Sequence, residues 1–156
     1  MLFEYQKGEL WDATALTAGT VYSEPIDLGA VRQSMGAGGD LWLSLTVNVA
    51  ESGTTNDTYV FTWQENTLEA DTGGTVVDVF SISLTTADSG RLGTAGNIIW
   101  CGTIPYYTGQ LQFGRWKAVL GNVSGTAGIT VDANYSPARP ATDRNARIFT
   151  SNVVAP

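Results

Sequence analysis

The residue types that carry most enzyme chemistry are scarce in this chain. Its 156 residues include no histidine and a single cysteine, Cys101. Histidine is the side chain that changes charge near neutral pH and the commonest metal ligand, so its absence excludes serine–histidine–carboxylate triads, cysteine–histidine dyads and histidine-based metal sites. Cys101 follows the apolar run Ile98-Ile99-Trp100, which predicts a buried and inert thiol, with an intermolecular disulfide as the alternative.

Carboxylate pairs are the remaining route to catalysis, because glycosidases cleave sugars with two Asp or Glu side chains and no histidine. The candidates on expected strands are Glu65, Asp78 and Asp132. No motif surrounds any of them. We therefore expect solvated acids on strand faces, and we predict that the chain is not an enzyme and has no catalytic residues.

Cofactor and metal sites are equally weak in the sequence. Asp57, or the acidic stretch with Glu69 and Asp71, offers oxygen ligands for calcium, but no segment has the ligand spacing of a calcium loop. The glycine-rich stretch 36–39 is not followed by a lysine and a helix, so phosphate-loop and dinucleotide fingerprints do not apply. We expect a plain connecting loop there, no bound metal and no cofactor.

The clearest element signal lies in residues 40–49, where leucine or valine occupies every second position. Side chains of a strand alternate between its faces, so this pattern predicts a sheet packed on one side. Trp42 falls on the opposite face from the leucines. We expect it to be covered by a partner or by second-face packing, with a carbohydrate-stacking platform as the alternative.

Short strands separated by glycine-bearing turns account for most of the chain. The expected strands are 20–27, 40–49, 58–64, 76–84, 96–104, 112–120 and 126–135, with loops at 29–39 and 85–95. No segment shows a sustained helical period with caps. The sequence therefore predicts an all-β protein, an antiparallel β-sandwich that is jelly-roll-like.

The two ends of the chain differ from this body in composition and in side-chain pattern. Residues 1–12 mix apolar and charged side chains without alternation and are expected to form an arm, whereas 13–135 form the sandwich and 136–156 a basic, proline-containing tail. Apolar side chains at both ends, together with the arginines of the tail, suit docking on a partner. The predicted partner-contact residues are Leu2, Phe3, Tyr5, Leu10, Trp11, Trp42, Arg139, Arg144, Arg147, Ile148 and Phe149.

The net charge of −7 limits the kind of partner. An acidic body disfavours binding along nucleic acid, because such binding depends on cationic side chains that displace counterions. No stretch approaches the run of about 18 apolar residues that crosses a bilayer, and the first residues lack a secretory pattern. We expect no nucleic acid partner, no membrane partner and synthesis in a host cytoplasm.

Four blocks of the sequence resemble a known family. The blocks are Asp12-Ala13-Thr14-Ala15-Leu16-Thr17, Ser23-Glu24-Pro25-Ile26-Asp27-Leu28-Gly29, Gly36-Ala37-Gly38-Gly39-Asp40-Leu41-Trp42-Leu43-Ser44-Leu45-Thr46-Val47 and Gly114-Arg115-Trp116-Lys117-Ala118-Val119. In this order they are similar to the capsid cement, or head decoration, proteins of tailed bacteriophages. The resemblance implies a jelly-roll protein without catalytic residues, which forms a homodimer or homotrimer on the outer surface of the virion.

From this resemblance we expect a decoration protein that binds the major capsid protein and stabilises contacts between its subunits. The alternative is a carbohydrate-binding module or a phage receptor-recognition domain, which the five tryptophans favour.

Overall fold

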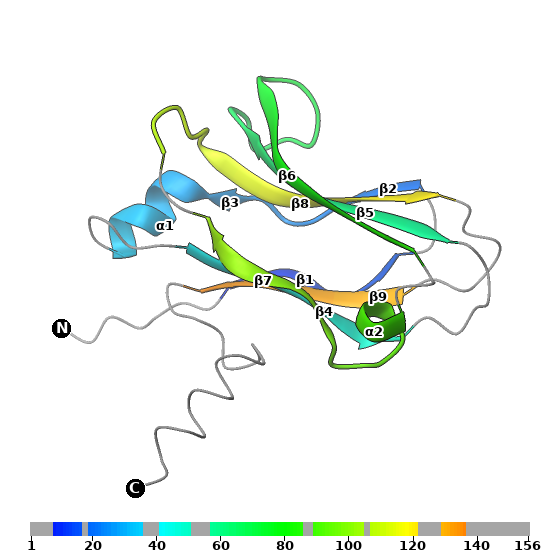
Figure 1. Cartoon of the computed structure of the whole chain (residues 1–156). Coiled ribbons are helices and arrows are strands. Elements are labelled where there is room, and N and C mark those ends of the chain that lie inside the picture. Colours follow the sequence, from blue (N-terminus) through cyan, green and yellow to red (C-terminus); the bar gives the residue numbers. More distant parts are fainter. Residues whose placement is uncertain are drawn as a thin grey trace, which may run out of the picture.

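A computed structural model describes residues 8–16, 19–35, 41–50, 57–85, 89–104, 107–121 and 129–136 (Figure 1). The strands are β1 (Gly8–Leu16), β2 (Gly19–Tyr22), β3 (Ile26–Asp27), β4 (Leu41–Val49), β5 (Thr58–Asn66), β6 (Val76–Thr85), β7 (Ile98–Ile104), β8 (Phe113–Gly121) and β9 (Ile129–Ser136). Two short helices are α1 (Leu28–Met35) and α2 (Ser89–Leu92).

The strands form two antiparallel sheets that pack face to face (Figure 1). One sheet has the order β1-β9-β4-β7, and we call it the β1 sheet. The other has the order β2-β8-β5-β6, with β3 also paired to β8, and we call it the β2 sheet. Among the described strands, β5 and β6 are the one consecutive pair that shares a sheet and forms a ladder. This is the strand order of a jelly roll, as predicted.

Alternation along the strands places the core between the sheets. In β4 the leucines of the predicted stripe, Leu41, Leu43 and Leu45, are fully buried. In the facing sheet, Trp63 of β5 lies opposite Trp116 of β8 and both side chains are fully buried. Their rings meet edge to face with centroids 5.6 Å apart, a favourable aromatic geometry.

The stretch 29–39 was expected to be a loop, and this is wrong for its first part because α1 begins at Leu28. The reason is a helix cap. The Asp27 carboxylate accepts a hydrogen bond from the Ala30 backbone N–H at 3.0 Å, and the Leu28 side chain is buried in the core. Gly29 lowers the helix propensity of this segment, and the cap together with tertiary burial outweighs that cost.

The predicted arm 1–12 also needs correction. Residues 8–12 belong to β1, which pairs with β9, and Leu10 and Trp11 are only 2% and 4% exposed. The strand is hard to recognise in the sequence because its pairing shifts register twice, which breaks the alternation of its side chains. At the second shift Ala13 has φ of 42°, a left-handed conformation that is uncommon for alanine.

The strand predicted over 20–27 is interrupted. Its two ends are β2 and β3, which both pair with β8, and Ser23, Glu24 and Pro25 lie between them outside any strand. Proline lacks the N–H that a ladder requires, so a break next to Pro25 is expected from its chemistry.

Candidate functional site

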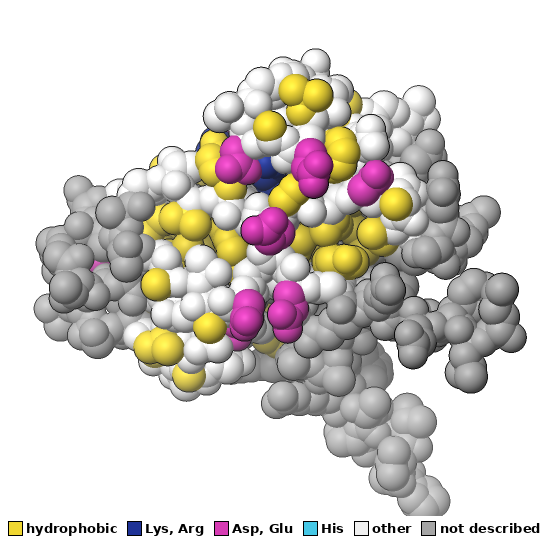
Figure 2. Space-filling view, turned by 180° about the vertical axis from the view of Figure 1, so that it is seen from behind, with side chains coloured by type: hydrophobic (Ala, Val, Ile, Leu, Met, Phe, Trp, Pro, Cys, Tyr) yellow, Lys and Arg dark blue, Asp and Glu magenta, His cyan; other side chains and the backbone are white. Residues whose placement is uncertain are grey.

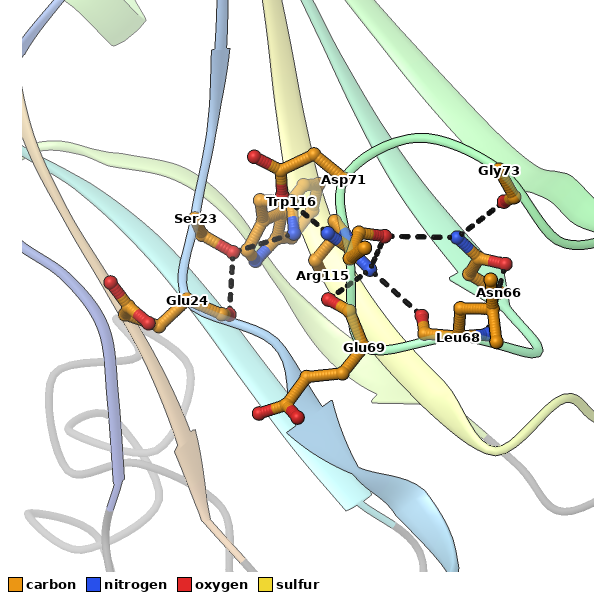
Figure 3. A network of polar contacts seen from close by, with 10 residues as sticks. Ser23, Glu24, Asn66, Leu68, Glu69, Asp71, Gly73, Arg115 and Trp116 are labelled. Atoms are coloured by element: carbon orange, nitrogen blue, oxygen red, sulfur yellow. Dashed lines mark hydrogen bonds and ion pairs between the residues drawn. The ribbon is translucent and has the colours of Figure 1, made fainter.

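A buried arginine holds the loop between β5 and β6. Arg115 lies on the outer face of the β2 sheet, yet its side chain is fully buried because residues 67–75 fold over it. Its Nη2 atom donates to the carbonyl oxygens of Leu68, Glu69 and Ala70 at 3.2, 2.9 and 2.7 Å (Figure 3). Its Nη1 atom forms an ion pair with Asp71, whose side chain is 54% exposed. The guanidinium therefore fixes four consecutive loop residues.

Asn66, the last residue of β5, holds the same loop from the inside (Figure 3). Its Nδ2 atom donates to the carbonyls of Ala70 and Gly73, both at 3.1 Å, and its Oδ1 atom accepts from the Leu68 N–H at 3.1 Å. Gly74 has φ of 68° and leaves no space for a Cβ atom beside Asn66 and Thr67. Side-chain hydrogen bonds from both Arg115 and Asn66 thus hold the loop in place.

Glu65 anchors a second loop, the one that leads into β8. Its carboxylate is fully buried and accepts from the Tyr107 hydroxyl at 2.6 Å, the Gln110 side chain at 3.1 Å and the Leu111 N–H at 3.1 Å. Burial, and then the contact with Glu65, raises the pKa of Tyr107 to about 12. The hydroxyl therefore stays protonated and remains a donor to the carboxylate across the physiological range.

Asp27 joins the start of α1 to the same loop. Besides capping the helix through Ala30, its carboxylate accepts from the Gln112 side chain at 3.2 Å. The backbone hydrogen bond of Ala30 and then the Gln112 amide lower the pKa of Asp27 below its ordinary value. Figure 1 shows α1 and the loop before β8 at one end of the sandwich, where β5 ends. We call this the anchored end: α1 with residues 64–75 and 107–115.

The anchored end is held together by two buried charged side chains. Arg115 and Glu65 bond to the protein itself, although the buried Nε atom of Arg115 has no hydrogen-bond partner in the described part of the chain. In the described part of the chain, no three His, Cys, Asp or Glu side chains are grouped so that they could hold a metal ion. Likewise, among the described residues no helix has the length and apolarity that crossing a bilayer requires.

Asp57 stands in contrast to Glu65 at the opposite end of β5. It precedes the first strand residue and is fully buried, but neither carboxylate oxygen has a hydrogen-bond partner in the described part of the chain. A buried carboxylate without partners is unfavourable, and one such group does not make a binding site.

The structure places the predicted partner-contact residues in three groups. Leu10 and Trp11 pack inside the sandwich and are corrected to core residues. Trp42 is half-buried on the outer face of the β1 sheet, next to Ser136 of β9 and Thr103 of β7. The predictions that lie outside the described residues are Leu2, Phe3, Tyr5, Arg139, Arg144, Arg147, Ile148 and Phe149, together with the glycine-rich stretch 36–39.

The three acids that were expected to be solvated differ in their exposure. Asp78 is exposed and accepts from the Gln64 side chain at 2.8 Å. Asp132 is partly buried and bonds the Ala13 N–H at 2.6 Å and the Asn48 side chain at 2.8 Å, so it stabilises the irregular part of β1. Glu65 was expected to be solvated as well, and this is wrong because the loop before β8 covers it.

Sequence reasoning did not identify Arg115, Glu65 and Asn66 as anchors. The available signal was the run Gln64-Glu65-Asn66, three polar residues at the end of a strand whose other residues alternate. Such a run predicts that the strand leaves its half-buried sheet environment, but it does not tell which loop will fold back over it.

No known protein-family model and no curated protein matches this chain. Its function therefore has to be argued from its own residues and geometry.

Proposed function

We propose that this protein is a capsid decoration protein of a tailed bacteriophage. It binds the outside of the shell, contacts the major capsid protein and stabilises the seams between capsid subunits. In this proposal it acts as a homo-oligomer, has no catalytic activity and is located on the virion surface.

The observation that carries the proposal is the use of buried charge at the anchored end. Arg115 and Glu65 are the kinds of side chain that perform chemistry in an enzyme, but here they hold loops in a fixed shape. A preformed loop surface loses little conformational entropy on binding, which favours docking onto a large partner.

The sequence blocks that resemble decoration proteins support the same role. Their described parts fall on β1, on β3 with the start of α1, on β4 and on β8. They contain the Asp27 cap and the Arg115 anchor, so the resemblance includes two of the residues that build the anchored end.

A decoration protein needs no reaction to act. A ligand that binds the closed shell, but not separated subunits, stabilises the shell by mass action. Many copies on one particle multiply a small contact free energy. The chain, with its net charge of −7, is suited to a protein partner more than to the packaged DNA.

The test uses intact virions from the source of this chain. We expect the protein at stoichiometric copy number in purified particles, accessible to antibody on intact heads, and located over capsid seams in image reconstructions. Heads stripped of it should release DNA at lower temperature and regain stability when it is added back. Particles that never contain the protein would refute the proposal.

A carbohydrate-binding module remains the second candidate because of Trp42, which is half-buried on an outer sheet face. The other four tryptophans do not support it, because Trp11, Trp63 and Trp116 are in the core and Trp100 packs against Phe80 and Trp116. Glycan-array binding that Trp42→Ala abolishes would favour this function over decoration.

A further inference from the structure

The strand β6 is the last strand of the β2 sheet in the part of the chain that the structure describes. It pairs with β5 on one side, and no described strand pairs with the other. At ten residues it is also the longest strand of the sheet. The edge at the opposite end of this sheet consists of β2, with four residues, and β3, with two. A long open edge presents a row of backbone donors and acceptors that suits another strand.

The side chains around this edge are mainly apolar and uncharged. Val76 and Val77 are 41% and 42% exposed, although valine is usually buried. Further apolar residues are only partly buried here, namely Val79, Phe80 and Ile82 of β6 and Trp100 of the neighbouring β7. Asp78 is the single charged residue in β6 and β7 together. An edge of this kind has few of the charges that proteins use to prevent strand pairing.

The other lateral side of the sandwich is strongly acidic. Figure 2 views the molecule from behind Figure 1 and shows acidic side chains gathered on that face. Glu9 and Asp12 of β1 are exposed, as is Glu24, whose backbone N–H bonds to Leu10 of β1. Two copies of a chain with net charge −7 repel each other least when they meet through the edge with the least charge.

The regular half of β6 is complementary to itself. The pairing with β5 shifts register between Trp63 and Gln64, which leaves Phe80–Thr85 in a regular ladder. In this half Ser81 and Ser83 are exposed on the outer face, whereas Leu84 and Ile82 pack toward the core. A twofold axis through Ile82 would set Ser81 opposite Ser83 and Phe80 opposite Leu84, so that hydroxyl meets hydroxyl and apolar meets apolar.

We propose that two copies of this chain associate by antiparallel pairing of their β6 strands, with Ile82 at the twofold axis. The pairing joins the two β2 sheets into one continuous sheet and covers the apolar side chains of both edges. The role of such a dimer on the capsid rests on the proposed function. The dimer itself can be tested with the purified protein, without capsids.

The experiment measures the mass of the full chain in solution by sedimentation equilibrium, for the unaltered protein and for two lysine variants. Ser83→Lys places a charge at the proposed seam in both copies, so we expect its dimer dissociation constant to rise by about tenfold or more. Thr20→Lys is the matched control, because Thr20 is exposed on β2 at the opposite edge of the same sheet. We expect Thr20→Lys to dimerise like the unaltered protein.

The register is tested with cysteines in a Cys101→Ser background. An equimolar mixture of Ser81→Cys and Ser83→Cys chains should form a disulfide-linked pair faster than either variant alone. Thermal melting of each variant shows whether the fold is retained, which we expect because these serines are exposed.

An unaltered chain that is monomeric or trimeric overturns the inference, as does a dimer that Ser83→Lys leaves intact. Equal weakening by Thr20→Lys and Ser83→Lys would also overturn it, because a general charge effect would then explain the result. Shell binding is scored separately. A β6 dimer that does not bind heads contradicts the proposed function alone, and a monomer that binds heads contradicts the β6 pairing alone.

Discussion

Along the side formed by β1, β2 and β3, the two sheets are joined by polar contacts, whereas along β6 and β7 they are joined by aromatic rings. We call these the polar edge and the aromatic edge. At the polar edge the Glu24 N–H bonds the Leu10 carbonyl of the opposite sheet at 3.1 Å. At the aromatic edge Phe80 of β6 and Trp100 of β7 pack with ring centroids 4.7 Å apart, and both rings contact Trp116.

The two edges differ in the features that oppose the addition of a partner strand. The polar edge is broken by Pro25 and by the irregular pairing of β1, and it is rich in carboxylates. These are features that oppose strand addition. The aromatic edge is regular and nearly uncharged, and Gly102 leaves room for the Trp100 ring, since a Cβ atom there would lie 2.7 Å from the ring. Among the described residues, the aromatic edge therefore has fewer features that oppose the addition of a strand than the polar edge.

The largest expected effect concerns the anchor beside the polar edge. Arg115→Ala removes a buried guanidinium and leaves three loop carbonyls without their donor, so we expect the free energy of unfolding to fall by roughly 3 kcal/mol. Urea unfolding measures this. The control is Arg91→Ala, because Arg91 is exposed on α2, and its effect should stay within about 0.5 kcal/mol. Similar losses in both variants would show that Arg115 is no anchor.

The second-largest loss of unfolding free energy is expected from a substitution at the aromatic edge. Trp100→Ala removes the ring that contacts both Phe80 and Trp116, and we expect a loss of about 2 to 3 kcal/mol that does not change between pH 4 and pH 9, since no titrating group takes part. Trp42→Ala is the control, because Trp42 lies on an outer sheet face, and it should cost clearly less. An equal cost would mean that the aromatic cluster does not hold the sheets together.

Tyr107→Phe tests the loop held by Glu65. Losing a hydrogen bond to a buried carboxylate should cost about 1.5 kcal/mol at pH 7. The pKa of Tyr107 is raised to about 12 from an ordinary value of 10, so this stabilisation is complete below pH 10 and is lost as the pH rises toward 12. The difference in unfolding free energy between Tyr107→Phe and the unaltered chain should therefore shrink over that interval. A constant difference would contradict the assignment.

The smallest expected effect is at β3. Asp27→Ala removes the cap of α1 and should cost about 1 kcal/mol at pH 7. Because the folded protein lowers the pKa of Asp27, the ionic part of this stabilisation is present above the ordinary carboxyl pKa and is lost as the pH falls through the folded value. Asp27→Asn keeps a capping side chain and should lose less. Unfolding of all three proteins at neutral and acidic pH measures both expectations.

The sandwich and its strands were predictable wherever the alternation of side chains is regular. The stripe of β4 and the expected strands corresponding to β5–β9 agree with the structure to within a few residues at each end. The strand β1 and the helices α1 and α2 were missed, α2 because the stretch 85–95 was expected to be a loop. In β1 a long-range hydrogen bond from the Ala13 N–H to Asp132 holds Ala13 in its left-handed conformation. In α1 the Asp27 cap is local, and the tertiary burial of Leu28 adds the support that a helix containing Gly29 needs.

The anchors of the candidate site were less predictable. Alternation along β8 places Arg115 on the face opposite Trp116, but alternation determines a face and not whether that face is covered. Its burial depends on a loop that starts about fifty residues earlier in the chain. Glu65 and Asp57 are both carboxylates at an end of β5, and only the folded chain makes one of them a bonded anchor and leaves the other without a described partner.

The sequence by itself determined the fold class of this chain, and it excluded reactions that require histidine. Periodicity and composition are local properties, so they carry the fold class and the absence of histidine chemistry without further information. Only the tertiary structure decided which charges are buried and which sheet edge is open. These depend on contacts between residues far apart in the chain, where a single loop closing over Arg115 converts an apparently exposed side chain into the centre of a fixed surface.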